Sequence, residues 1–329
     1  MTPSVYVVLP CYRTLGLTVE VIAGIGPEVA GIVVVDDGCP DGTGDHVSAA
    51  VTDPRVVVLR HAANQGVGAA TLTGFAHAFA RGADIAVKLD GDGQMHPGDI
   101  ARLVRPIALG QADVAKGNRF FNPAWLERMP ADRRLANLLL SFSSKPSSGY
   151  WAMFDASNGF FAIHRAVFAM LPVERLARGY YFETDLWFRL GLVRAVIVDV
   201  PIAPRYSEAA AATSQVRLWR LAPVFVGNVL RNGFKRLFYR YLLQDFSAGS
   251  LYLALAVVLT GFGGVFGLAT WIHNAVQGVV TTPGTVMLAA LPVFLGLQFL
   301  FAFLAFDISA QPTRPLHPDL GPGPGDFGA

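Results

Sequence analysis

The sequence Asp90-Gly91-Asp92-Gly93-Gln94 directly follows the strand-like run Ala83–Leu89. Its two glycines allow a sharp turn where the chain leaves a sheet, so both carboxylates can face one point at the carboxyl edge. Ligands of open α/β folds bind at this edge. Carboxylate oxygens with few other ligands suit Mg²⁺ or Mn²⁺, held in part by the phosphates of a substrate. The alternative is an ordinary turn between a strand and a helix, because Asp and Gly are common turn residues.

Residues 1–215 alternate strand-like and helix-like segments. The strand-like segments before Asp90 are Val5–Leu9, Gly31–Val35, Val56–Arg60 and Ile85–Leu89. Helix-like segments lie near Leu17–Ile25, Gly42–Val51 and Gly66–Arg81. This order predicts a doubly wound parallel sheet with helices on both faces. Later strand-like segments are Val114–Gly117, Ala156–Ile163 and Ala195–Val200, with looser spacing. The predicted fold class is therefore α/β with a mixed second half.

Two common phosphate-binding motifs are absent from this part of the chain. The first strand is followed by Pro10-Cys11-Tyr12-Arg13 rather than by a G-x-G-x-x-G loop, and no Walker A motif occurs. The only cysteines, Cys11 and Cys39, follow different strands and have no neighbouring His at zinc-ligand spacing, so we expect neither a disulfide nor a zinc site. Nucleotide binding would then depend on acidic and aromatic groups and on a metal.

The C-terminal third has the composition of a membrane hairpin. Charged residues make up 15% of the chain, against about 25% in typical soluble domains. None occurs between Asp245 and Asp307. The apolar runs Leu251–Ile272 and Thr285–Phe306 each approach the length of about 20 residues that spans a bilayer. We therefore predict two transmembrane helices within residues 246–308, at about 248–272 and 285–306.

The regions that flank the predicted spans differ in charge. Residues 216–245 are basic and amphipathic, which predicts juxtamembrane helices on the cytosolic side. Their basic residues are Arg217, Arg220, Arg231, Lys235, Arg236 and Arg240. A hairpin returns the C-terminus to the same side, so we expect a multi-pass membrane protein with both termini cytosolic. Residues 309–329 are rich in Pro and Gly and are predicted to be disordered.

Several motifs occur together in an order that resembles a known family. They are Val8-Leu9-Pro10-Cys11-Tyr12, Val34-Val35-Asp36-Asp37-Gly38, Asn64-Gln65-Gly66-Val67-Gly68-Ala69-Ala70, Leu89-Asp90-Gly91-Asp92-Gly93-Gln94, Lys116-Gly117-Asn118-Arg119-Phe120, Asp155-Ala156-Ser157-Asn158-Gly159-Phe160 and Pro201-Ile202-Ala203-Pro204-Arg205-Tyr206. This set resembles the family 2 glycosyltransferases of GT-A fold. Within them the chain is most similar to the polyprenyl-phosphate hexosyltransferases, the dolichol-phosphate mannose synthase group. The resemblance covers residues 4–308 and includes the hairpin.

The resemblance implies roles on the donor side of the site. Pro10 and Tyr12 would line the nucleobase pocket, and Asp37 would hydrogen-bond the base. Asp90 and Asp92 would hold Mg²⁺ or Mn²⁺ on the diphosphate of the donor, a UDP- or GDP-hexose, with Gln94 nearby. Many relatives have Asn-Glu where this chain has Arg13-Thr14, so part of the base contact differs. Asp36 is interpreted as a structural partner at the strand end.

On the acceptor side, the resemblance implies that Arg119, and Arg133 or Arg134, bind the phosphate of the acceptor. Arg suits bidentate phosphate contacts; surface charge is the alternative. Asp155 and Asp185 match acidic residues of the family, and either could shape the acceptor site or act as a base. A lipid phosphate has its second pKa near about 6 and is already nucleophilic at neutral pH, whereas a sugar hydroxyl needs a general base.

The predicted function is inverting, metal-dependent transfer of a hexose of the glucose or mannose class to a polyprenyl or dolichyl phosphate at the cytosolic membrane face. One alternative is a polysaccharide synthase with a sugar hydroxyl as acceptor, because Gln215-Val216-Arg217-Leu218-Trp219 is close to its Q-x-x-R-W motif. Another is a catalytically silent membrane scaffold. Membrane lipid is an expected partner and nucleic acid is not, since the basic residues lie beside the spans. Self-association through the hairpin is left open.

Overall fold

The computed structural model describes residues 2–127, 129, 131–203 and 218–321. The chain forms two compact units. We name residues 1–233 and 312–329 the α/β unit, and Phe234–Gln311 the hairpin unit. The α/β unit contains the sheet and the turn at Asp90, whereas the hairpin unit contains the long apolar helices.

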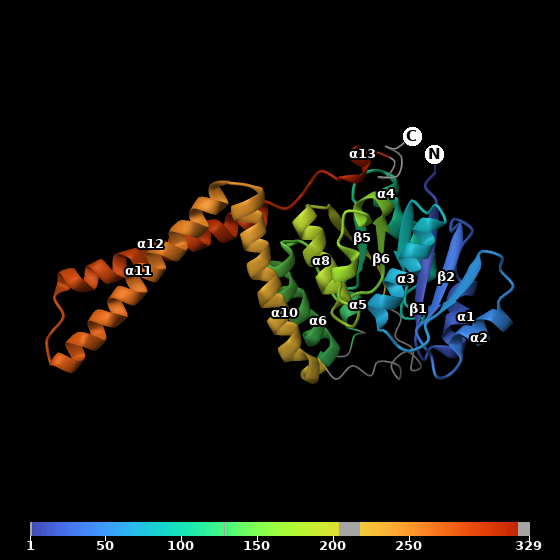
Figure 1. Cartoon of the computed structure of the whole chain (residues 1–329), viewed down its shortest axis with the longest axis horizontal. Helices are drawn as coiled ribbons and strands as arrows, with labels where there is room; N and C mark the ends of the chain where they lie inside the picture. The colour runs from blue at the N-terminus through green and yellow to red at the C-terminus, as the bar shows by residue number, and fades with distance from the viewer. Residues whose placement is uncertain (1, 128, 130, 204–217, 322–329) are drawn as a thin grey trace. The chain divides into compact units, whose positions relative to one another are not determined.

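The α/β unit is built on a mixed sheet of seven strands in the order β3-β2-β1-β4-β6-β5-β7 (Figure 1). Its strands are β1 (Val5–Cys11), β2 (Gly31–Asp36), β3 (Val56–Arg60), β4 (Ile85–Lys88), β5 (Val114–Asn118), β6 (Phe161–His164) and β7 (Ile197–Pro201). Strands β3, β2, β1 and β4 are mutually parallel, and β6 runs antiparallel to its neighbours β4 and β5. The predicted α/β class and mixed second half are confirmed.

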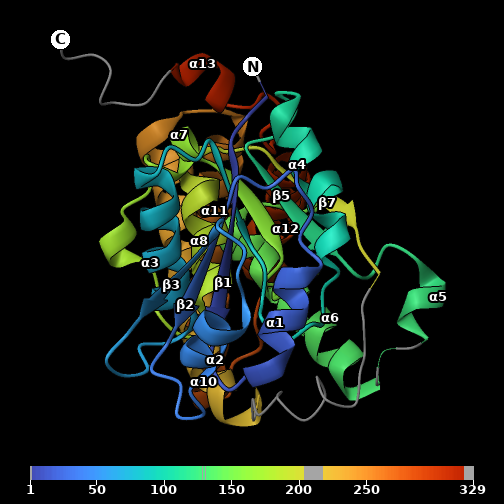
Figure 2. The same cartoon turned by 90° about the vertical axis from the view of Figure 1, so that its right-hand side faces the viewer.

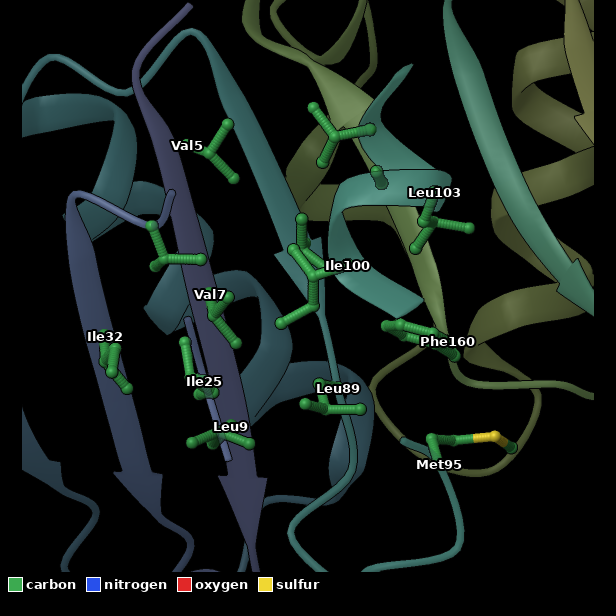
Figure 3. Packing of buried hydrophobic residues seen from close by; sticks show 14 of the residues in the cluster. Val5, Val7, Leu9, Ile25, Ile32, Leu89, Met95, Ile100, Leu103 and Phe160 are labelled. Carbon is green, nitrogen blue, oxygen red and sulfur yellow. The ribbon is translucent and has the colours of Figure 1, made fainter. Parts of the chain in front are cut away.

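Helices cover both faces of the sheet (Figure 2). They are α1 (Leu15–Ala23), α2 (Thr43–Ala50), α3 (Val67–Ala80), η1 (Pro97–Asp99), α4 (Ile100–Ala108), α5 (Pro123–Leu126), α6 (Ala131–Ser148), α7 (Arg165–Phe168), η2 (Val173–Arg175) and α8 (Phe182–Val193). Successive strand residues point to opposite faces, so Val7 of β1 packs with α1 and α4, and Val8 packs with α3. Figure 3 shows the first of these layers, in which Val7 lies beside Ile100 and Leu9 beside Ile25.

One predicted strand begins later than its sequence suggests. The expected segment Ala156–Ile163 becomes β6 only from Phe161. Asp155 has a left-handed φ of 58°, and the Asn158 N–H donates to its carbonyl at 3.0 Å. This turn uses backbone groups that a strand would need for its ladder, which explains the shorter strand.

The hairpin unit contains η3 (Tyr239–Gln244, a π-helix), α11 (Ala248–Gln277) and α12 (Pro283–Ser309). The last two are long and apolar enough to cross a membrane, and only 11% of each apolar window is buried. They pack through small residues: a Cβ on Gly296 would lie 2.2 Å from the Thr260 hydroxyl, and one on Gly263 would lie 2.6 Å from the Ala289 carbonyl. Close backbone approach of this kind is typical of helices that associate in lipid.

A buried ion pair lies at the ends of these helices and corrects one expectation. Arg236 makes a bidentate pair with Asp307 at 2.8 and 2.7 Å, and the Tyr241 hydroxyl donates to the same carboxylate at 2.6 Å. Arg236 was predicted to belong to a basic surface, but its guanidinium is buried and neutralised because α12 ends with a carboxylate beside it. Arg217 and the side chain of Arg220, expected on that surface too, lie outside the described residues.

The C-terminal segment also differs from the prediction. Instead of being disordered throughout residues 309–329, the chain forms α13 (His317–Leu320) within the α/β unit. The buried Asp113 carboxylate accepts hydrogen bonds from the backbone N–H groups of Leu316 and His317 at 2.8 and 2.9 Å. The His317 ring lies 3.0 Å from Asp113 and stacks on His164. These contacts give the polar, Pro-rich segment a specific binding place that its composition does not reveal.

We expect the stability of this contact to depend on pH through His164. Burial, together with the charge of His317, lowers the pKa of His164 to about 4. An unfolded His has a pKa near about 6.5, so the unfolded chain binds more protons between these values. Stability should therefore fall as pH falls from about 6.5 towards 4, by about 1 kcal/mol after allowance for partial solvent screening.

The variant His164→Asn tests this expectation, because Asn can still cap the Ala166 N–H that His164 caps. Thermal unfolding of the purified protein at pH 7 and pH 5 should show a smaller loss of Tm in this variant than in wild type. The control is His96→Asn, an exposed histidine that caps Gly98 in the same way. Equal losses in His164→Asn and wild type would contradict the assignment.

Candidate active site

The predicted donor residues lie at the carboxyl edge of the parallel strands. Pro10 is the sixth residue of β1, and Tyr12 follows that strand, 41% exposed. Proline is unusual within a central strand because it lacks an N–H. It is tolerated here because the pairing of β1 with β4 ends at Val8 and Lys88.

The turn after β4 positions Asp90 and Asp92. Gly93 has a φ of +73°, a conformation that favours glycine. Gly91 is packed so closely that a Cβ would lie 2.9 Å from both the Cys11 sulfur and the Thr18 hydroxyl. The Asp92 carboxylate accepts the Gln94 N–H at 3.0 Å, and this bond fixes its direction. The Asp-Gly-Asp-Gly sequence thus forms a tight turn whose carboxylates are held by their surroundings.

A buried lysine joins this turn to α8. Lys88 is 1% exposed, and its Nζ lies 2.7 Å from Asp90 and 3.1 Å from Glu183. Burial alone would lower the pKa of Lys88, but the charges of Asp90 and Glu183 outweigh burial and raise that pKa above its usual range. Lys88 therefore stays charged and neutralises part of the negative charge gathered at the turn.

The electrostatics of Asp92 connect the turn to Arg119. Burial and the charge of Asp90 raise the pKa of Asp92 to about 6, and the positive charges of Lys88 and Arg119 oppose that rise. Within the described residues, no group of three or more His, Cys, Asp or Glu side chains could hold a metal. Two carboxylates fit Mg²⁺ or Mn²⁺ only if substrate phosphates and water supply the remaining ligands, which is the usual arrangement for Mg²⁺ in phosphate-binding sites.

Asp37 contacts the protein itself more extensively than predicted. Its carboxylate accepts the N–H groups of Gln65 and Gly66 at 2.9 and 2.8 Å and lies 2.7 Å from the His61 ring. It is 3% exposed. Asp37 thus fixes the loop that begins α3, and its contact with a nucleobase stays a prediction. Asp36 accepts the N–H groups of Cys39 and Gly44, in agreement with the structural role expected for it.

Arg119 and Asp155 form a buried bidentate pair. The Arg119 Nε and Nη2 atoms donate to the two Asp155 oxygens at 2.8 and 2.7 Å, and the Arg119 backbone N–H also donates to Asp155. Burial tends to raise the pKa of Asp155, but the Arg119 guanidinium outweighs burial and holds it below its usual range. With its side chain 0% exposed and both oxygens bonded to Arg119, Asp155 is better suited to orienting Arg119 than to accepting a proton.

Two further lysines hold the loop that carries Asp155. The Lys116 Nζ is fully buried and donates to the carbonyls of Phe154 and Asp155, and it pairs with Asp199 at 3.2 Å. The Lys145 Nζ donates to the carbonyls of Trp151 and Met153 at 2.5 and 2.7 Å. These carbonyl contacts fix the left-handed backbone at Asp155, and with it the direction of the Arg119 side chain.

The structure separates Asp185 from the turn at Asp90. The Asp185 carboxylate accepts hydrogen bonds from Ala177 N–H, Arg189 and Asn232 at 3.0 to 3.3 Å. It is Glu183, two residues earlier on α8, that contacts Lys88. Arg134 is exposed, with its guanidinium 3.5 Å from the Leu126 carbonyl. The side chain of Arg133 lies outside the described residues, so its acceptor role stays a prediction.

Sequence reasoning missed Lys88, Glu183 as its partner, and Lys116. A signal for the lysines was present, because each lies inside a short apolar strand: Ile85-Ala86-Val87-Lys88 and Val114-Ala115-Lys116. Lysine is almost never fully buried unless it is paired. The partners could not be read from the sequence, since Glu183 is 95 positions from Lys88 and meets it only through packing of α8 on the sheet.

Comparison with known proteins agrees with this geometry. Residues 6–171 match the family described as Glycosyl transferase family 2. The UDP-N-acetylglucosamine–dolichyl-phosphate N-acetylglucosaminyltransferase of Methanococcus voltae is 28% identical over 73% of this chain and 95% of its own. The polyprenol monophosphomannose synthase of Mycolicibacterium smegmatis is 32% identical over 61% of this chain and 77% of its own.

A solved structure shares the fold at lower identity. Mannosyl-3-phosphoglycerate synthase from Rubrobacter xylanophilus superposes with a TM-score of 0.51 and 19% identity, over 74% of this chain and 77% of that one. The match in sequence covers the region with the Asp90 turn, Arg119 and Asp155. The chain therefore belongs to glycosyl transferase family 2 and is a glycosyltransferase of GT-A fold.

Proposed function

We propose that this glycosyltransferase moves a hexose from a nucleoside diphosphate sugar to a polyprenyl phosphate at a membrane surface. The proposal rests on one observation: an acidic turn that could hold a cation lies within electrostatic reach of an arginine that could bind a phosphate. The carboxylates of Asp90 and Asp92 suit a cation on the donor diphosphate, and Arg119 acts electrostatically on Asp92 from the adjoining loop. One relative is named as a dolichyl-phosphate transferase and the other as a polyprenol monophosphomannose synthase. These names support a lipid phosphate as the acceptor.

In the proposed reaction, different residues of the site bind the donor diphosphate and the acceptor phosphate. Asp90 and Asp92 would hold Mg²⁺ or Mn²⁺, which neutralises charge that develops on the leaving diphosphate. Arg119, oriented by Asp155, would bind the acceptor phosphate. An oxygen of that phosphate then attacks the anomeric carbon while the bond to the diphosphate breaks, so the configuration inverts. No general base is needed, because the phosphate is largely dianionic at neutral pH. We therefore assign positioning roles to Asp155 and Asp185.

We further propose that α11 and α12 cross the membrane as a hairpin, with the α/β unit and the C-terminus on the same side. Leu316 and His317 are hydrogen-bonded to Asp113 within the α/β unit, so the chain must return to that unit after α12. The exposed Arg231 and Lys235 before α11 favour the cytosolic side. Tyr12, Pro10 and Gln94 are retained as proposed donor contacts.

The donor and acceptor are tested by incubating membranes that contain the full-length protein with labelled UDP-glucose, UDP-N-acetylglucosamine or GDP-mannose, each with polyprenyl phosphate. One donor should give a labelled lipid, and membranes with the Asp92→Asn variant should give none. This panel also decides the sugar, since the two relatives use different ones. Transfer of the label to a soluble sugar, with no labelled lipid formed, would contradict the proposal of a lipid phosphate acceptor and would favour a sugar hydroxyl as acceptor.

The metal role predicts that EDTA abolishes transfer and that added Mg²⁺ or Mn²⁺ restores it. Asp92→Asn should lower kcat/KM by at least about 100-fold, because charge on the leaving diphosphate is no longer neutralised. Asp45→Asn is the matched control, since Asp45 is 84% exposed on α2. Full activity of the Asp92 variant, or of wild type in EDTA, would show that the reaction proceeds without a metal on these carboxylates.

The hairpin topology predicts opposite accessibility of two epitope tags. One tag follows residue 329, and the other is inserted at Val280, an 88% exposed residue between α11 and α12. In sealed vesicles, protease should digest the C-terminal tag and the α/β unit together and leave the Val280 tag protected, or the reverse when the vesicles are inverted. Cleavage of both tags from one side would contradict a hairpin that spans the bilayer.

A further inference from the structure

Lys88 occupies an enclosed position between the Asp90 turn and α8. It is the last residue of β4, where Leu89 and Asp90 leave the sheet. Its Nζ lies 2.7 Å from Asp90 Oδ1 and 3.1 Å from Glu183 Oε1. With 1% of its side chain exposed, Lys88 cannot reach a bound substrate or exchange a proton with solvent. Its function must be exerted through the two carboxylates.

Gly159 closes the remaining side of this ammonium group. A Cβ at position 159 would lie 2.4 Å from both Lys88 Nζ and Asp90 Oδ2. The backbone of the Asp155–Phe160 loop therefore approaches as closely as glycine allows, and Asp90 is confined between this loop and Lys88. Asp90 Oδ1 accepts the hydrogen bond from the lysine, and Oδ2 lies against Gly159, so both oxygens of this carboxylate are held in direction.

The charges explain why such a partner is needed. Asp90, Asp92 and Glu183 bring three carboxylates to one end of the sheet, and like charges at short distance repel one another. A buried carboxylate without a partner is costly. Lys88 offsets this repulsion and fixes the direction of one carboxylate. In known metal sites, partners that hydrogen-bond to the ligands orient them, and their loss typically weakens metal binding by about 10- to 100-fold.

We propose that Lys88 is a positioning residue of the metal site, which fixes Asp90 through Oδ1 and joins the Asp90 turn to Glu183 on α8, so that the Asp90 carboxylate keeps the orientation in which it would bind the cation. The inference rests on the proposed metal role of Asp90 and Asp92. Lys88 also carries a positive charge, which by itself repels a divalent cation. Removal of Lys88 therefore distinguishes the two effects by sign: loss of orientation weakens metal binding, whereas simple loss of repulsion strengthens it.

The test measures Mn²⁺ binding to the full-length protein, from the loss of the free Mn²⁺ signal in electron paramagnetic resonance, with excess UDP and in a parallel series with excess GDP. Lys88→Met removes the charge and keeps the length of the side chain. Because it leaves Asp90 and Glu183 without a cation, it can fail to fold, so Lys88→Met/Glu183→Gln, which also removes one negative charge, is the second variant. Lys235→Met, at an exposed lysine, is the control.

Each folded Lys88 variant should bind Mn²⁺ about 10- to 100-fold more weakly than wild type, while Lys235→Met matches wild type. If Lys88→Met does not fold, the double variant decides. Unchanged or tighter Mn²⁺ binding in a folded Lys88 variant, with wild-type binding intact, would overturn the role of Lys88 alone. A wild-type protein that binds no Mn²⁺ with either nucleotide would overturn the proposed metal site, and this inference with it.

Discussion

The site depends on holding several carboxylates close to one another at the carboxyl end of β4 in spite of their mutual repulsion. Asp90, Asp92 and Glu183 gather there, and water screens them only in part because Glu183 is buried and the two aspartates are half-buried. The fold offsets their repulsion with the buried Lys88, whose pKa is raised by the same carboxylates. The sheet edge can therefore present an acidic surface to a cation without destabilising the turn that carries it.

A second set of buried charges serves the opposite purpose. Arg119 is oriented by Asp155, and Lys116 and Lys145 hold the Asp155 loop through backbone carbonyls. Positive charge is thereby fixed in direction close to the acidic turn, and Arg119 and Asp92 influence each other electrostatically. A transferase that joins two phosphate-bearing substrates needs both kinds of charge in one place, because the donor diphosphate and an acceptor phosphate repel each other.

The C-terminal segment adds a constraint that the catalytic residues do not need. Asp113, at the opposite end of the sheet from the Asp90 turn, binds Leu316 and His317. The hairpin unit is thus connected to the α/β unit by covalent chain at both of its ends. Two connections restrict the relative motion of linked units more than one connection does, because fewer chain conformations satisfy both.

The sequence by itself determined the alternation of strands and helices along the chain up to β4, the mixed second half, the acidic turn and the two long apolar helices. These follow from local patterns: short Val- and Ile-rich runs, glycine-flanked aspartates and charge-free stretches, each of which constrains only its own neighbourhood. By resemblance to a family, it also predicted Arg119 and Asp155 as site residues. It did not reveal that these two side chains form an ion pair, because they are 36 positions apart along the chain.

Only the tertiary structure decided which charges face one another. Asp185 and Glu183 are equally acidic in sequence, yet packing of α8 directs Glu183 to Lys88 and Asp185 to Arg189. Likewise, the sequence pattern counts Arg236 with the basic surface residues, but its side chain is buried against Asp307. The Pro-rich C-terminal segment is bound by Asp113, which the pattern does not indicate. Whether a charged side chain is exposed or paired depends on partners brought together by long-range packing, and that information is not contained in the local pattern around the residue.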